Sequence, residues 1–500
     1  MTQLPSDNPR SDKSALIVVA AERTTEIFLS DARLEKVASD VGRLETQVVP
    51  GIYKIRYRSG NVTQDELIEV PPGGLEKPVE GKPFAFATAR PLTETLTTHE
   101  YQRGPARSAA REPASLPPGG HSVLLFHREG DETRTFTCSR LSLWALDGTC
   151  IAAEDEGELD TRARYRVLRR ELEPSTYALR AETATGGHVE IFFTVCRGWQ
   201  TQIFVEQEVA GEACAPALHT ASVGMAPYGG PPPPDDLKRE AEIVKAAFMA
   251  GRRLAPPDFV EAWLCAPAGD PITGLCLAHS LLQSEGDDDM VIRVIARLSD
   301  ADVLGGGHPD VQGLIAALTI RDRNRVSNVY RELLGTLKAA GDSMTCAWPP
   351  TLRDSWEALV KLSKRRATII PPDSFNARMA ADLVGSGAVM MRRVDDRPAY
   401  IDSTTLAGAR AAETALLMNG IPDDVMANLS FNLNRLEKSV LASLAVIDTQ
   451  SALNAMPSGT RAPTQLGPLT RKLVDATGAP AYSVANAIVN VANMVIKPDA

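Results

Sequence analysis

The sequence predicts a multidomain protein in which two N-terminal all-β sandwich-like modules are followed by a mainly α-helical C-terminal half. The chain has 500 residues, well beyond the roughly 250 to 300 at which one hydrophobic core stops growing. Short alternating apolar runs bounded by turn residues fill its first two-fifths, which is typical of strands. After the four prolines at 231–234, apolar residues recur instead at helical spacing.

The first module is predicted over residues 15–72, after a polar segment at 1–14 that lacks periodicity and is expected to be disordered. A β-branched run at 15–20 and an alternating run at 24–29 indicate its first strands. The alternating residues at 52–57 and the run at 67–70 indicate the strands that complete a small β-sandwich.

Residues 73–120 are rich in Pro and Gly, carry Arg103, Arg107 and Arg111, and are interpreted as a linker with one strand near 84–88. The second module follows at 121–210, and its closely spaced short strands favour a sandwich or jelly-roll. The predicted strands are 123–127, 133–138, 141–146, 165–168, 177–181, 189–195 and 199–205.

A second Pro/Gly-rich linker is predicted at 211–234, and an α-helical array, with helix pairs stacked as in a solenoid, at 235–370. Asp235 or Asp236 is a good helix cap, and apolar residues recur from Leu237 to Phe248 before Gly251. The remaining helices of the array are expected at 257–264, 273–283, 290–298, 311–318, 327–339 and 352–366. Residues 371–500 are predicted to be mainly helical, with strands at 389–393 and 398–401 and helices at 404–419, 424–449 and 482–496.

Two hairpin segments share one pattern: a proline turn, a tyrosine, an alternating strand, a glycine hairpin and a further strand. The first copy runs from Pro50-Gly51-Ile52-Tyr53 to Val70, and the second from Glu173-Pro174-Ser175-Thr176-Tyr177 to Val195. Each resembles the β-sandwich repeats called PEGA or carboxypeptidase-regulatory-like domains over about twenty-five residues. That resemblance implies non-catalytic modules that act as spacers or present surfaces, and it assigns no functional residue.

Net charge, the length of apolar runs and the spacing of cysteines bear on the partners and the location of the protein. A net charge of −10 opposes binding to nucleic acid or to an anionic membrane surface, so neither partner is expected. No apolar run approaches the roughly 20 residues that span a bilayer, and the run at 15–21 is too short for a secretory signal. Seven dispersed cysteines fit a reducing compartment rather than a disulfide framework. We therefore expect a soluble, cytoplasmic protein.

No catalytic, cofactor or metal motif is found in the sequence. A phosphate loop is excluded because the only Gly-Lys pair precedes Pro83, and no serine has the two glycines of a nucleophile elbow. Cys265, Cys276, His279 and His308 are the nearest approach to a zinc site. The paired-ligand knuckle of structural zinc is missing, however, so buried core residues are the favoured interpretation and no cofactor is expected.

Five residues are the candidates for protein contact. Trp348 and Trp356 could anchor a partner, since interface energy concentrates in a few buried aromatic or arginine side chains. Asn486, Asn490 and Asn493 lie at spacings i, i+4 and i+7 on the last predicted helix. They could form a polar contact face, and the exposed side of an ordinary helix explains the same spacing.

The helical region carries three distinctive segments: Asp235-Asp236-Leu237-Lys238-Arg239-Glu240, Gly307-His308-Pro309-Asp310-Val311 and Pro349-Pro350-Thr351-Leu352-Arg353-Asp354-Ser355-Trp356. With these segments the region resembles uncharacterised bacterial proteins that accompany caspase-like or trypsin-like peptidases. That resemblance implies a regulatory or targeting subunit and not a peptidase.

Two functions remain open. Modules without a catalytic signature favour a non-enzymatic scaffold or adaptor that contacts a protein partner. The sequence leaves the oligomeric state of this chain undetermined. The alternative is a hydrolase whose site is assembled from scattered residues between the second β module and the helices. A deep pocket with convergent polar groups would favour the enzyme, and a broad apolar groove would favour the adaptor.

Overall fold

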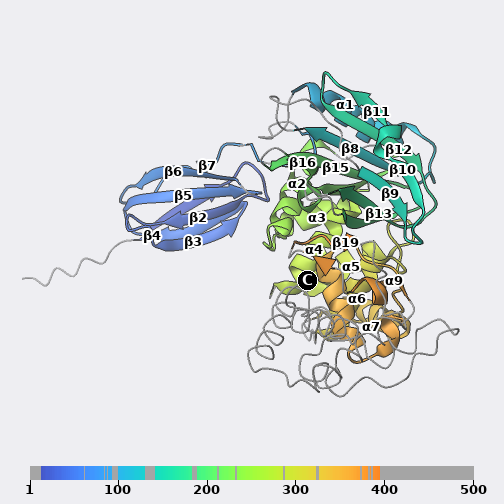
Figure 1. Cartoon of the computed structure of the whole chain (residues 1–500). Helices are drawn as coiled ribbons and strands as arrows, with labels where there is room; N and C mark the ends of the chain where they lie inside the picture. The colour runs from blue at the N-terminus through green and yellow to red at the C-terminus, as the bar shows by residue number, and fades with distance from the viewer. Residues whose placement is uncertain are drawn as a thin grey trace, which may run out of the picture.

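The order of β modules followed by helices is confirmed in the computed structural model (Figure 1). The structure describes residues 13–394, except for 61, 84, 87, 93–99, 130–140, 183–187, 211–212, 231–233, 268, 285–287, 322–325, 372–373, 381–382 and 385–386. The strand predicted at 133–138 and every element predicted beyond 394 lie outside the described residues.

The first module consists of two antiparallel-rich sheets that share one core. Its sheets have the orders β4-β1-β7 and β3-β2-β5-β6. Alternate residues such as Leu16, Val18, Ile27, Leu29 and Ile55 point inward, as the period-2 pattern predicts. The strands are β1 (Ser14–Val19), β2 (Glu26–Ser30), β3 (Lys36–Val41), β4 (Arg43–Val48), β5 (Gly51–Ser59), β6 (Val62–Val70) and β7 (Val79–Glu80).

Both of the repeated sequence patterns form antiparallel hairpins, β5–β6 and the pair β13 (Ser175–Glu182) and β14 (His188–Val195). Each tyrosine donates its hydroxyl hydrogen to a carbonyl four residues earlier in the chain: Tyr53 to Val49 at 2.7 Å, and Tyr177 to Glu173 at 2.8 Å. This bond fastens the entry turn to the strand, so the proline, the turn and the tyrosine act together in both copies.

The second module also has two sheets, of orders β11-β12-β8-β15-β16 and β10-β9-β13-β14-β19-β18, and β17 pairs with the free part of β15. Strands β8 and β15 pair in parallel at the centre of the first of these sheets. The strands are β8 (Ser122–Glu129), β9 (Leu141–Ala145), β10 (Cys150–Ala153), β11 (Glu158–Asp160), β12 (Tyr165–Glu171), β13 (Ser175–Glu182), β14 (His188–Val195), β15 (Trp199–Ala210), β16 (Ala213–Pro216), β17 (Ser222–Pro227), β18 (Leu383–Val384) and β19 (Met391–Val394).

Neither of the segments interpreted as linkers is a plain spacer. The segment 211–234 contains β16 and β17, and β17 pairs with β15 along its whole length. The segment 73–120 contains α1 (Glu100–Arg111), which packs on β8 through Ala106 and Ala109. In addition, β18 and β19 reach the second module from the helical region, so that module is built from more of the chain than 121–210.

Helices α2, α5 and α6 and strand β17 contact α4 (Pro271–Gln283), whose apolar residues are nearly all buried. α7 and α8 pack on α6, so the described helices pack around α4 and α6 rather than stacking in successive pairs. Among the described helices, none combines the length and apolar character needed to cross a bilayer. The others are α2 (Asp235–Met249), α3 (Pro257–Cys265), α5 (Asp288–Ser299), α6 (Pro309–Ile320), α7 (Asn328–Ser343), α8 (Arg353–Ser363) and α9 (Phe375–Met379).

Helix α2 also joins the first module to the rest of the protein, as Figure 1 shows at the side of the small β module. Arg23 makes a two-pronged ion pair with Glu240, with a shortest N to O distance of 2.6 Å. Arg239 pairs with Glu22 at 3.0 Å, so in this second pair the cation lies on α2 and the carboxylate on the first module. These pairs connect one face of α2 to the first module and leave its opposite face for the second.

Candidate functional site

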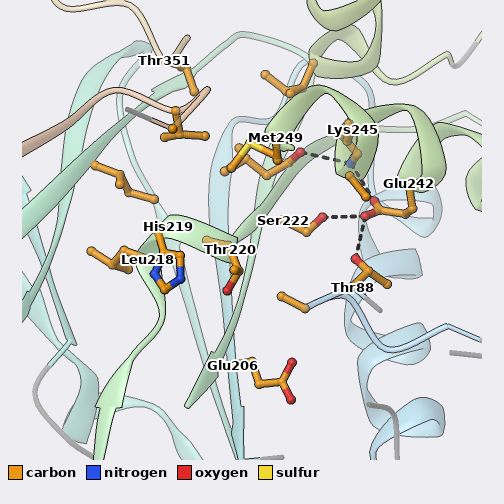
Figure 2. Close-up of a pocket in the computed structure, with 18 of the residues that line it drawn as sticks. Thr88, Glu206, Leu218, His219, Thr220, Ser222, Glu242, Lys245, Met249 and Thr351 are labelled. Atoms are coloured by element: carbon orange, nitrogen blue, oxygen red, sulfur yellow. Dashed lines mark hydrogen bonds and ion pairs between the residues drawn. The ribbon is translucent and has the colours of Figure 1, made fainter. Parts of the chain in front are cut away.

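A cavity of about 690 Å³ lies between the second β module and the helices. Its walls come from β15, β17, α2 and α4, together with the residues just before α8 and around β19. Most of the lining is apolar, and a small group of polar side chains is set into one wall (Figure 2). Ligand pockets in proteins commonly have this size and this mixture of surfaces.

A charged cluster forms one wall, where Ser222, Thr88 and Lys245 converge on Glu242 (Figure 2). The Ser222 hydroxyl donates to Glu242 Oε2 at 2.8 Å, and the Thr88 hydroxyl donates to the same oxygen at 3.1 Å. Lys245 Nζ lies 2.6 Å from Glu242 Oε1 and 3.3 Å from Asp270 Oδ2. The cluster therefore links β17 to α2 and α4.

The charges in this cluster are held by their neighbours. Burial raises the pKa of Glu242, but Lys245 and Arg90 outweigh it, so the pKa lies below its ordinary value. Burial lowers the pKa of Lys245, but Glu242 and Asp270 outweigh it, so the pKa lies above its ordinary value. A carboxylate that holds its charge so firmly is a poor proton acceptor at neutral pH.

Arg128 on β8 fixes the segment that carries Thr88 and is itself fully buried. Its Nε donates to the Ala89 carbonyl at 3.0 Å, and its Nη2 donates to the Thr88 carbonyl at 3.0 Å and to Glu206 at 3.2 Å. A buried guanidinium is tolerated only when its donors are satisfied. This part of the cavity wall is therefore held rigidly.

The wall that contains Thr351 and Leu352 is held by Asp310, in the first turn of α6. The Asp310 carboxylate is fully buried and accepts hydrogen bonds from the backbone N–H groups of Thr351 at 2.7 Å and Leu352 at 2.9 Å. Leu352 in turn forms a β-bridge with Val389. Two of the distinctive segments of the helical region thus meet through this single side chain.

Thr351 lines the cavity and is almost completely buried, at 1% exposure. Its hydroxyl oxygen is buried and has no hydrogen-bond partner within the described part of the chain. An unsatisfied buried hydroxyl costs about 1 to 3 kcal/mol.

Cys276 and His279, one turn apart on α4, are poorly suited to nucleophilic chemistry. Burial raises the pKa of the Cys276 thiol, which keeps it protonated and unreactive. Burial lowers the pKa of His279 to about 4, and its Nε2 lies 2.8 Å from the Ser355 hydroxyl. Ser355 is also fully buried, so substrate could not reach this Ser–His pair.

The buried His279 makes stability depend on pH. The side chain stays neutral in the folded state down to about pH 4, whereas the unfolded chain binds a proton below its ordinary pKa of 6.5. Stability contributed by neutral His279 is therefore present above pH 6.5 and is lost as the pH falls towards 4. Between pH 7 and 5 the expected loss is about 2 kcal/mol.

Urea unfolding at pH 7 and pH 5 measures this loss. His279→Gln should reduce the difference between the two pH values by about that amount of 2 kcal/mol, whatever its effect at either pH alone. Ser280→Ala, a change without a titrating group on the same helix, is the matched control and should leave the difference unchanged. An unchanged pH difference in His279→Gln would show that His279 is not buried as a neutral group.

The four residues weighed as a zinc site do not form one. Cys265 is exposed at the end of α3, Cys276 lines the cavity, and His308 accepts a hydrogen bond from the backbone N–H of Asp310 at 3.1 Å. No group of three or more His, Cys, Asp or Glu residues suited to a metal ion occurs in the described ranges.

The residues predicted to contact a partner occupy different environments. Trp356 is fully buried in the core around α8 and α9, which is the position of a core residue rather than a surface anchor. Trp348 is 50% exposed, and its carbonyl accepts a hydrogen bond from Asn376 at 2.7 Å. Asn486, Asn490 and Asn493 lie outside the described residues.

Sequence reasoning did not identify Glu242, Lys245 or Ser222 as a group. Glu242 and Lys245 are one helical turn apart on α2, and on their own they resemble an ordinary surface pair. A signal was nevertheless present: both lie beside the apolar stripe that contains Ala241, Val244 and Phe248, where charge is costly unless it is paired.

No family model matches the chain, and no curated protein sequence matches it. Among solved structures, the chain has a partial match to "The Bacillus anthracis TIE protein", with a TM-score of 0.15 and 10% identity. The match covers 36% of this chain and 31% of the other, and at that TM-score it carries no argument about fold or function.

Proposed function

We propose that this protein is a non-enzymatic, cytoplasmic adaptor whose contact with a protein partner responds to a small amphipathic molecule held in the cavity. The observation that carries the proposal is the composition of the cavity walls. Segments as distant in sequence as Thr88, Ser222, Lys245 and Thr351 meet there, so both the β module and the helices enclose one space.

A ligand in this cavity would touch both parts at once. Binding to the folded state stabilises that state by mass action. A bound ligand would therefore stabilise the packing of the β module against the helices that line the site. The apolar walls suit the hydrophobic body of a ligand, while the polar side chains set into one wall suit a polar group. These features favour a molecule with an apolar body and one polar group.

Convergent polar groups in a pocket are what the enzyme alternative predicts, but the charge state of this wall favours binding over catalysis. Ser222 donates its hydroxyl hydrogen to Glu242, which Lys245 and Arg90 hold in its charged form. Activation of a serine needs a base that can take up its proton, and this carboxylate is already committed to two cations. The arrangement therefore supports a fixed recognition surface.

Trp348 is the best-placed residue for contact with a protein partner. Its side chain is half exposed just before α8, close in sequence to the Thr351 wall, and Asn376 fixes its backbone. Aromatic side chains on a rigid backbone commonly anchor interfaces. The resemblance of the helical region to peptidase-associated proteins suggests a peptidase as the partner, with this chain as its regulatory or targeting subunit.

Titration with N-phenyl-1-naphthylamine, an uncharged fluorescent probe, tests the proposed ligand site. The wild-type protein should bind the probe saturably, and Ala246→Trp, which places an indole in the cavity, should weaken binding at least tenfold. Ala301→Trp, at an exposed turn, is the matched control and should bind as the wild type does. Equal binding by all three proteins would contradict the proposal, once melting curves show that each is folded.

The second candidate function is the hydrolase, which the contact between Ser222 and Glu242 inside the cavity favours. Turnover of p-nitrophenyl butyrate separates it from the adaptor. The adaptor predicts the same slow background rate for the wild type and Ser222→Ala. A rate that Ser222→Ala abolishes, in a folded variant that still binds the probe, would replace the adaptor with the enzyme.

A further inference from the structure

A second, smaller cavity of about 270 Å³ lies between α1 and the start of α2, apart from the charged cluster described above. Its described lining is strongly basic, since two carboxylates, of Asp235 and Asp236, face six cationic side chains. The cationic residues are Arg90, Arg103, Arg107, Arg111, Lys238 and Arg239.

Three of the arginines follow one face of α1, at spacings of four residues. Like charges at this spacing destabilise a helix. Among the described side chains, Asp235 offsets two of them, by accepting from Arg107 at 2.6 Å and from Arg111 at 3.1 Å. Arg103 makes no ion pair in the described part of the chain, and its Nε is buried without a hydrogen-bond partner.

Two other cations at this cavity form ion pairs with carboxylates that do not line it. Arg90 reaches Glu242 at 3.4 Å, on the wall of the larger cavity, and Arg239 pairs with Glu22 of the first module at 3.0 Å. Lys238 shares the same Asp235 at 3.7 Å. One carboxylate therefore serves three cations, and the cavity keeps an excess of positive charge although the chain as a whole is acidic.

We infer that this cavity, between the arginine face of α1 and the N-terminus of α2, binds the diphosphate group of a small phosphorylated molecule. Guanidinium groups match the geometry of phosphate oxygens and bind them in pairs. The first turn of α2 adds the positive end of its helix dipole. An anion of this class supplies the negative charge that the described side chains lack.

The charge state of Lys238 supports this inference independently of the contacts. Burial, together with Arg90, Arg111 and Arg107, lowers its pKa to about 8, even though Asp235 acts in the opposite direction. A lysine whose charge is suppressed by its neighbours reports a positive local field. That field would attract an anion and would be relieved by its binding.

Titration calorimetry of the full-length protein with inorganic pyrophosphate, at fixed ionic strength, tests the site. The wild type should bind one equivalent, and Arg103→Gln should weaken binding about tenfold, as expected when one charge-assisted contact is lost. Arg33→Gln, an exposed arginine that does not line the cavity, is the matched control and should bind as the wild type does.

Asp235→Asn provides a test that misfolding cannot imitate. It releases Arg107, Arg111 and Lys238 from their shared carboxylate, so pyrophosphate should bind several-fold more tightly than to the wild type. No saturable binding by the wild type, equal weakening in Arg103→Gln and Arg33→Gln, or weaker binding by Asp235→Asn would each overturn the inference.

A diphosphate group can be free in solution or carried by a lipid headgroup, and two further arms separate these sources. ADP titration tests the soluble form. Co-sedimentation with phosphatidylcholine vesicles, with and without CDP-diacylglycerol, whose headgroup carries a diphosphate, tests the lipid form. Binding in either arm that Arg103→Gln weakens supports the site, and binding in neither arm contradicts it.

Discussion

Asp310→Ala is expected to lower the free energy of unfolding by about 2 to 6 kcal/mol, because it leaves two buried N–H groups without an acceptor at about 1 to 3 kcal/mol each. The Asp310 carboxylate is fully buried and binds the N–H groups of Thr351 and Leu352. Chemical denaturation of the folded variant measures the loss.

Two variants control this experiment. Asp310→Asn keeps one side-chain acceptor and should cost about half as much as alanine. Asp302→Ala, in an exposed turn nearby, should cost less than about 0.5 kcal/mol. A loss below about 1 kcal/mol in Asp310→Ala would mean that Asp310 does not hold the wall of the larger cavity.

Lys245→Met is expected to cost about 3 to 5 kcal/mol, because removing one member of a buried ion pair leaves the other charge uncompensated. Lys245 Nζ faces both Glu242 and Asp270, and it also donates to the Val223 carbonyl at 3.1 Å. Asp270 additionally caps α4 through the N–H of Ile272 at 3.1 Å. Removal of the lysine therefore destabilises the start of α4 as well as the cavity wall.

The double variant Glu242→Gln with Lys245→Met separates pairing from packing. Its cost should be smaller than the sum of the two single variants, and the difference measures their coupling. Lys361→Met, an exposed lysine 3.9 Å from Glu357 on α8, should cost about 0.5 kcal/mol or less. Additive costs in the double variant would contradict the description of Glu242 and Lys245 as a coupled pair.

Local signals in the sequence predicted the elements whose structure is locally determined. α2 follows the apolar spacing from Leu237 to Phe248, although it begins at Asp235, so both aspartates lie in its first turn rather than at its cap. The two tyrosine hairpins form because the turn, the strand pattern and the tyrosine contact all lie within about twenty-five residues.

Helix α1 was missed for an identifiable reason. It contains Gly104 and Pro105, and its buried face consists of the small residues Ala106 and Ala109 with the polar Gln102. Gln102 is fully buried because its amide donates to the carbonyls of Glu129 and Ala163. A helix that packs through alanines and one glutamine has no apolar stripe for a pattern to detect.

The pairing of distant strands and the cavity could not be predicted. β17 lies in a segment interpreted as a linker, and it becomes a strand because β15 offers an unpaired edge. A strand was predicted at 389–393 and β19 spans Met391–Val394, but its pairing with β14 joins segments far apart in the sequence. The cavity joins residues from Thr88 to Val389, so no local spacing encodes it. The sequence did place the alternative site between the second β module and the helices, which is where the cavity lies.

Hydrogen exchange with and without N-phenyl-1-naphthylamine tests the ligand site most directly, because it shows where the probe binds. We expect slower exchange at both walls of the larger cavity, in peptides covering β17 and α2 on one side and Thr351 and Leu352 on the other. Ala246→Trp should abolish both changes. Exchange that slows elsewhere, at one wall alone, or equally in Ala246→Trp would contradict a ligand site shared by the β module and the helices.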